Sequence, residues 1–114
     1  MKAQGVKPIV GQLVIERDQE QCVARVTHPG KAAPGEQIHH RKPRRMGGTT
    51  QRSTNGVTNL IYLCRPCHEW IENNRDLSTD LGWLLRASQS PTEAPLLYRG
   101  VWSLLRDDGT ISAA

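Results

Sequence analysis

Apolar residues in the first third of the chain come in short runs between polar and glycine-rich stretches. Within residues 8–18, Val10, Leu13 and Val14 recur at the spacing of one helix face, so a short helix is favoured there, although the Val and Ile residues of this segment also favour a strand. Residues 28–35 contain two Pro-Gly steps, which interrupt regular structure and predict a loop.

Three further runs predict short strands, two of them rich in apolar or β-branched residues and the middle one ending in the two histidines. They cover residues 23–27, 36–40 and 59–63, and a long polar stretch separates the last two. A loop of that length in a small domain is usually functional. Pro66 suits the first turn of a helix, because its missing N–H would be unpaired there anyway, so residues 67–74 are expected to be helical. The middle of the chain therefore predicts a hairpin followed by a helix.

The pattern after residue 75 is simpler and contains fewer candidate catalytic or metal-binding side chains. Residues 96–98 and 101–105 predict two strands about a turn at Arg99 and Gly100. We expect this tail to pack on the rest of the domain through three aromatic side chains, Trp83, Tyr98 and Trp102.

The chain has 114 residues, which suits one small domain. Only 37% of them are apolar and none is Phe, so the core is thin and a metal or a disulfide would help to hold it together. We expect an α+β fold in a single domain of residues 1–114. Its core covers about residues 22–74, and a small β extension covers about residues 77–109.

The net charge of +4 favours a polyanionic partner. The number of cysteines, three, is odd, and two of them form a Cys-x-x-Cys pair beside a histidine. That pattern favours metal binding in a reducing compartment over a disulfide framework. Residues 1–7 lack the apolar run of a signal peptide, and no stretch approaches the roughly 20 apolar residues that span a bilayer. We therefore expect a soluble cytoplasmic protein with no membrane partner.

The residues that can carry chemistry lie close together in the sequence. His39 and His40 end the second predicted strand, Asn59 opens the third, and His68 directly follows the Cys-x-x-Cys pair. Phosphodiester cleavage needs a nucleophilic water, which a histidine with a pKa near neutrality can activate. It also needs neutralisation of the phosphate and of the departing oxygen, which a divalent cation can supply. Consecutive strand residues point to opposite faces, so a local twist must bring both histidines to one phosphate.

This arrangement resembles the motif of HNH endonucleases, in particular the small HNH proteins of phages and actinobacteria. The resemblance covers about residues 22–74 and implies a ββα-metal core: a short hairpin followed by a helix. It implies that His40 is the general base, that His39 and His68 hold the catalytic cation, and that Asn59 holds the hairpin loop so that the base keeps its orientation. The implied cation is Mg²⁺ or Mn²⁺, although imidazole ligands also accept Zn²⁺ or Ni²⁺.

The resemblance also implies DNA as the partner and a cut that leaves a 5′-phosphate and a 3′-hydroxyl. It implies a cytoplasmic protein that is either encoded by the bacterial host cell or encoded by a phage. A phage packaging complex with a terminase is a further partner that the resemblance allows.

Many relatives of this type hold a structural zinc with two Cys-x-x-Cys pairs, and this chain departs from that pattern. Cys64 and Cys67 match the second pair, but Cys22 is not followed by a partner cysteine. Structural zinc takes four ligands. The fourth could be His28 or a water, and a degenerate site without zinc stays open.

Basic residues surround the paired histidines. Their guanidinium and ammonium groups are expected to hold backbone phosphates without reading sequence. They are Arg41, Lys42, Arg44, Arg45 and Arg52.

Plainer interpretations stay open beside these. Adjacent histidines can be a solvated pair, and Cys-x-x-Cys can be two buried thiols. Trp70 is expected in the core with the other tryptophans, and Glu72 and Asn73 on the helix are expected to face solvent, although a helical neighbour of His68 could complete a metal site. The alternative function is a non-catalytic zinc module that binds nucleic acid or a protein.

Overall fold

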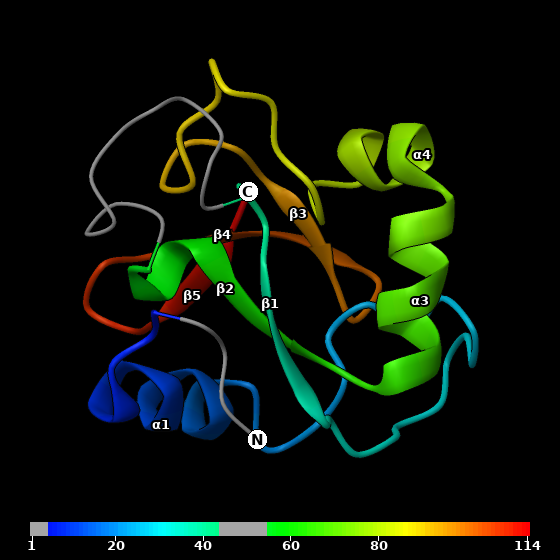
Figure 1. The fold of residues 1–114 in the computed structure, drawn as a ribbon, viewed down its shortest axis with the longest axis horizontal. Helices are drawn as coiled ribbons and strands as arrows, with labels where there is room; N and C mark the ends of the chain where they lie inside the picture. The colour runs from blue at the N-terminus through cyan, green and yellow to red at the C-terminus, as the bar shows by residue number, and fades with distance from the viewer. Residues whose placement is uncertain (1–4, 44–54) are drawn as a thin grey trace.

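Two small antiparallel sheets and a few short helices form an α+β structure, described here by a computed structural model of residues 5–43 and 55–114 (Figure 1). In chain order the elements are α1 (Pro8–Arg17), β1 (Gln37–His40), the 3₁₀ turn η2 (Val57–Asn59), β2 (Leu60–Leu63), α3 (Arg65–Asn73), α4 (Arg75–Asp80), β3 (Leu96–Tyr98), β4 (Val101–Leu105) and β5 (Ile111–Ala113).

The first sheet is the pair β1–β2, which crosses the middle of the molecule and leads directly into α3 (Figure 1). Its register pairs Gln37 with Leu63 at one end and His40 with Leu60 at the other. The predicted strands at 36–40 and 59–63 and the helix after Pro66 are confirmed. This order places the paired histidines and the first turns of α3 on neighbouring elements.

The predicted N-terminal helix is also confirmed as α1, and the residue after it attaches it to both sheets. The fully buried Asp18 carboxylate accepts hydrogen bonds from the Arg17 guanidinium, the Tyr62 backbone N–H in β2 and the Tyr98 hydroxyl in β3. Burial raises the pKa of Tyr98, and the nearby negative charge of Asp18 adds a smaller effect in the same direction. This network joins parts of the chain that sequence periodicity treats separately.

The second sheet has the order β3–β4–β5 and contains the two strands predicted in the tail. Trp83 and Tyr98 are buried in the main apolar cluster, as expected. The expectation for Trp102 was wrong, because its side chain is 44% exposed on β4. Helix α4 and strand β5 were not predicted.

The strand expected at residues 23–27 is absent, and the chain there is irregular. Val23 is nevertheless paired: its N–H donates to the carbonyl oxygen of Tyr62, and its carbonyl oxygen accepts from the N–H of Arg99. The backbone then turns at Arg25, whose φ of 54° is incompatible with an extended strand. Val23 alone therefore links β2 to the residue after β3, and the segment at 23–27 adds no strand to either sheet.

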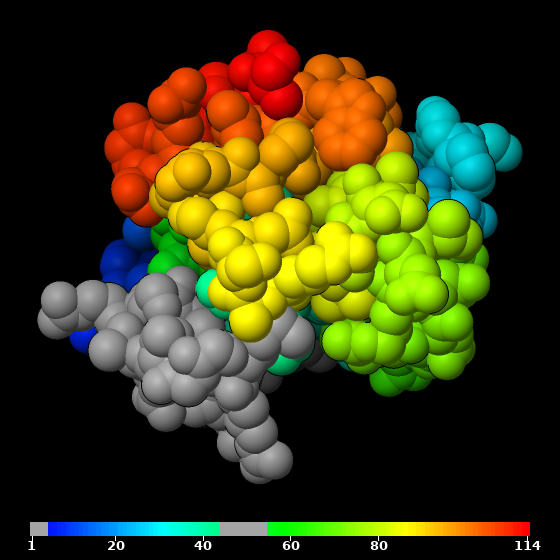
Figure 2. All heavy atoms as spheres, turned by 90° about the horizontal axis from the view of Figure 1, so that it is seen from above, coloured from blue at the N-terminus to red at the C-terminus, as the bar shows by residue number. Residues whose placement is uncertain are grey.

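The segment between α4 and β3, yellow in Figure 2, lies between the green helices and the orange C-terminal sheet. Its loop begins with Gly82 at φ +80°, next to the buried residues Trp83, Leu84 and Leu85. The C-terminal part of the chain is therefore packed against the hairpin and not appended to it. Among the described residues, no helix has the length and apolar character needed to cross a bilayer.

Candidate active-site pocket and metal centre

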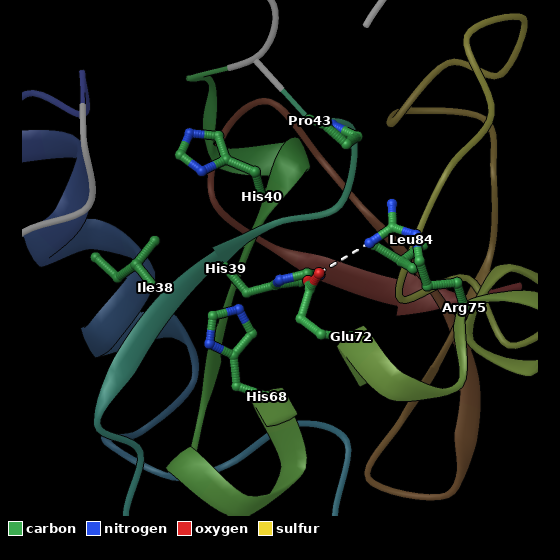
Figure 3. A pocket seen from close by; sticks show the side chains of 8 residues that line it. All are labelled: Ile38, His39, His40, Pro43, His68, Glu72, Arg75 and Leu84. Carbon is green, nitrogen blue, oxygen red and sulfur yellow. Dashed lines mark hydrogen bonds and ion pairs between the residues drawn. The ribbon is translucent and has the colours of Figure 1, made fainter. Parts of the chain in front are cut away.

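Two of the predicted site histidines meet in space. His39 from β1 and His68 from α3 have ring centroids 5.1 Å apart, in an edge-to-face arrangement. Together with Glu72 they offer three ligand atoms that all lie within 4.8 Å of one another (Figure 3). Glu72 follows His68 by one helical turn, so both side chains leave α3 on the same side. These three residues could hold a metal ion.

Hydrogen bonds to outer oxygens set which nitrogen of each neutral ring carries the lone pair. The Nε2 of His39 donates to the carbonyl oxygen of Trp83 at 2.8 Å, so the neutral ring keeps its lone pair on Nδ1. The Nδ1 of His68 donates to the Gln37 side-chain oxygen at 2.5 Å, which leaves the lone pair on Nε2. Metal-binding histidines are commonly oriented by such outer oxygen partners. In its neutral form each ring therefore keeps a lone pair on the nitrogen that the outer oxygen does not hold.

The electrostatics of His39 also suit a ligand. The side chain is 4% exposed, and burial lowers its pKa from 6.5 to about 3. The hydrogen bond to Trp83 opposes this shift, and the charges of His68 and His40 add smaller effects that lower the pKa. The ring stays neutral at physiological pH and cannot lose its lone pair to a proton. A neutral imidazole is the form that binds metals.

His40 lines the same pocket, but its side chain leaves β1 on the side opposite to that of His39. In Figure 3 its ring projects to the opposite side of the strand from His39, as alternation along a strand requires. Both rings still line one hollow of about 390 Å³, together with Pro43, His68 and Glu72. The Nε2 of His40 donates to the Asn55 side-chain oxygen at 2.7 Å. In the neutral ring the lone pair is therefore on Nδ1.

Asn59 holds the backbone just after the paired histidines. Its side-chain oxygen accepts from the N–H of Lys42 at 2.7 Å, and its amide nitrogen donates to the carbonyl oxygen of Lys42 at 2.9 Å. Its own carbonyl oxygen accepts from the N–H of Arg41 at 2.8 Å. The side chain is fully buried and so ties the end of β1 to the start of β2.

Arg41 was wrongly expected to contact phosphates. It is fully buried, and its guanidinium donates to four carbonyl oxygens, those of Gly82, Thr58, Pro91 and Ala94. Burial lowers its pKa to about 10, with a smaller effect from the charge of Arg17. This arginine holds the loop after α4 against the hairpin.

The other expected phosphate contacts have different outcomes. Lys42 is half-buried, and its ammonium group donates to the carbonyl oxygen of Gln89 at 3.1 Å. Arg44, Arg45 and Arg52 lie outside the described residues.

A second cluster brings the three cysteines together with His28. The sulfurs of Cys22, Cys64 and Cys67 and one ring nitrogen of His28 all lie within 4.8 Å of one another and could hold a metal ion. The Nδ1 of His28 donates to the carbonyl oxygen of Lys31 at 2.8 Å, so its Nε2, 3.4 Å from the Cys64 sulfur, carries the lone pair. The sequence had left the fourth ligand open, and the loop at 28–35 brings this imidazole to the thiols.

The thiols differ in their readiness to ionise. Burial raises the pKa of Cys64 to about 12. Burial also acts against ionisation of Cys67, but hydrogen bonds from Thr27 and from the other two thiols outweigh it and lower that pKa to about 7. The Thr27 hydroxyl lies 3.2 Å from the Cys67 sulfur. A cation would therefore deprotonate Cys67 more readily than Cys64.

Sequence reasoning expected Glu72 to face solvent and left open that a helical neighbour of His68 completes a metal site, and it assigned no role to Gln37, Asn55 or the carbonyl of Trp83. The four-residue spacing of His68 and Glu72 was a usable signal for the role of Glu72. Nothing local in the sequence identifies the other three, because each contact joins distant parts of the chain.

Comparisons with protein-family models, with curated proteins and with solved structures found no match for this chain.

Proposed function

We propose that this protein is a metal-dependent endonuclease of the HNH type that hydrolyses phosphodiester bonds in DNA. The observation that carries the proposal is the convergence of His39, His68 and Glu72, with ligand atoms within 4.8 Å, in the pocket that His40 also lines. The antiparallel pair β1–β2 followed by α3 supports it, because this is the order that the ββα-metal core requires.

In this proposal His40 is the general base. Its Nε2–H is held by Asn55, so its Nδ1 takes the proton of an attacking water. The water oxygen bonds to phosphorus while the bond from phosphorus to the 3′-oxygen breaks. This leaves a 5′-phosphate and a 3′-hydroxyl, with the leaving oxygen protonated by solvent. Asn59 keeps the backbone after His40 in place through both of its bonds to Lys42.

His39, His68 and Glu72 would hold the cation. A divalent ion such as Mg²⁺ or Mn²⁺ there supplies charge neutralisation at the phosphate and the leaving oxygen. Two imidazoles and one carboxylate also suit Zn²⁺ or Ni²⁺. The protein contributes pre-oriented rings, because the Trp83 carbonyl and the Gln37 side chain each hold one nitrogen of their ring.

The cysteine cluster supports a structural Zn²⁺ as a second metal. Three sulfurs and one imidazole are a common ligand set for closed tetrahedral zinc sites. The same cluster favours the alternative function, a zinc module that binds nucleic acid or a protein without catalysis. That alternative needs the set Cys22, His28, Cys64 and Cys67 but has no use for a base beside a second cation site.

Supercoiled plasmid DNA distinguishes the two functions. We expect the purified protein to nick or linearise it with Mn²⁺ or Mg²⁺ and to stop when EDTA is added. His40→Ala should abolish cutting while the melting temperature and DNA affinity stay near those of wild type. Wild-type protein that carries stoichiometric zinc and binds DNA but cuts under none of these conditions would instead establish the zinc module.

A further inference from the structure

Arg75 is the one arginine or lysine that lines the pocket around the histidines in the ranges 5–43 and 55–114. Its Nη1 lies 2.8 Å from the Glu72 carboxylate, and the two side chains are 50% and 48% exposed. Figure 3 shows this ion pair beside the rings of His39 and His68. The guanidinium therefore sits at the mouth of the pocket, held by a carboxylate that belongs to the candidate cation site.

Arg41 and Lys42, the two described members of the expected basic set, do not fill this position. Arg41 is enclosed in the protein, and the ammonium group of Lys42 is bonded to the loop carbonyl of Gln89. Arg75 comes from the start of α4, so it was outside the basic stretch that the sequence had indicated. A guanidinium presents a planar fork of donors that matches the oxygens of a phosphate.

The charges around the pocket mouth depend on what Glu72 binds. With no cation bound, the carboxylate neutralises Arg75 across their 2.8 Å contact. When Glu72 acts as a metal ligand, its negative charge is shared with the cation, and the guanidinium is more available to another anion. Glu72 is the only carboxylate among the pocket-lining residues that the structure describes. The metal-loaded pocket is therefore positive and suited to a singly charged phosphodiester.

We infer that Arg75 binds a backbone phosphate of DNA at the mouth of the pocket, and that its ion pair with Glu72 restrains this binding in the metal-free protein. The inference rests on the proposed function for the identity of the phosphate source. Arg75 is then a substrate-positioning residue that places the phosphate beside His40 and the candidate cation ligands.

DNA affinity measured without cleavage tests the first part. In a His40→Ala background, a labelled duplex is titrated with protein in Mn²⁺ at several salt concentrations, with fluorescence anisotropy as the readout. Arg75→Gln should weaken binding by roughly three- to tenfold and reduce the salt slope by about 0.9, the loss of one phosphate contact. The matched control is Arg106→Gln, on an exposed arginine that bonds Ser112 away from the pocket. Equal losses in both variants would overturn the inference.

A double-mutant cycle in EDTA tests the restraint. Removing the Glu72 charge by Glu72→Gln should tighten DNA binding by about two- to fivefold, the range expected for an exposed ion pair. The gain should vanish when Arg75→Gln is added, because the two effects share one contact. A gain of equal size in the double variant would overturn the restraint. Melting temperatures confirm that each variant is folded, and Arg75→Lys should recover part of the affinity.

These measurements separate the two proposals. If the wild-type protein never cuts DNA but Arg75→Gln alone weakens binding, the phosphate contact stands and the nuclease does not. If the wild type cuts while Arg75→Gln binds and cuts like Arg106→Gln, the nuclease stands and the phosphate contact does not.

Discussion

The Nε2 of His39 donates a hydrogen bond of 2.8 Å to the carbonyl oxygen of Trp83, 44 residues further along the chain. The bond fixes the tautomer of a candidate metal ligand in β1 from a loop that follows α4. The C-terminal part of the chain is thus a component of the candidate site. Its contribution is a backbone carbonyl, which no side-chain motif can reveal.

The turn that presents the Trp83 carbonyl should tolerate no side chain at Gly82. A Cβ there would lie 2.1 Å from the carbonyl oxygen of Pro95, at a φ of +80°. We expect Gly82→Ala to lower the free energy of unfolding by about 3 kcal/mol or more. Gly100→Ala is the matched control: its φ is +86° but no atom lies within 4 Å of the added Cβ. Gly100→Ala should lower the free energy of unfolding by only about 1 kcal/mol, the cost of placing a Cβ at a positive φ without a clash. Urea unfolding measures both, and equal costs would contradict the steric account.

Arg41 should act on stability and not on DNA binding directly. Arg41→Met leaves four carbonyl oxygens without their donor, so we expect a loss of about 3 kcal/mol or more. Arg41→Lys should recover little, because an ammonium group cannot reach carbonyls in several directions. Lys42→Met, next to it and half-buried, should cost less than about 1 kcal/mol. Thermal unfolding of the three variants gives the comparison, and an Arg41→Met protein as stable as wild type would rule out this structural role.

Zinc removal should destabilise the whole domain. The cysteine cluster contains residues of the main apolar core, so its ligands and the core are held together. We expect about one zinc per chain, a fall in melting temperature of more than about 10 °C on chelation, and three thiols that become reactive to a thiol reagent. Cys67→Ser should reproduce the fall. His39→Ala with His68→Ala should leave the zinc content unchanged, and loss of zinc in that variant would mean that the two sites are not separate.

The stability of the metal-free protein should depend on pH through His39. Its pKa is lowered from 6.5 to about 3 in the folded protein, so below pH 6.5 the unfolded chain takes up a proton that the folded protein does not. The stability present above pH 6.5 is therefore lost as the pH falls toward 3, by up to about 1.4 kcal/mol per pH unit.

Urea unfolding in EDTA at a series of pH values, compared with His39→Gln, isolates this contribution. The variant should show a shallower acid loss between pH 6.5 and 4, because it lacks the titrating ring. Identical slopes in the two proteins would show that His39 is not buried in its neutral form.

Short-range patterns in the sequence predicted much of the framework. Apolar spacing and runs located α1, β2, β3 and β4, because each pattern reports which face of one element is buried, and Pro66 indicated the start of α3; the strand expected at 36–40 matches β1. The adjacent histidines and the Cys-x-x-Cys-His run indicated two groups of candidate metal ligands, because imidazole and thiol side chains are common metal ligands.

Only the tertiary structure decided which side chains share a space. Arg41 reads as a surface cation, yet the loop after α4 encloses it. Glu72 was expected to face solvent and Arg75 had no assigned role, yet both line the pocket. The irregular segment at 23–27 and the exposed Trp102 differ from expectation for the same reason. Local spacing specifies the direction of a side chain relative to its own element, whereas burial and partners depend on how distant segments pack against that element.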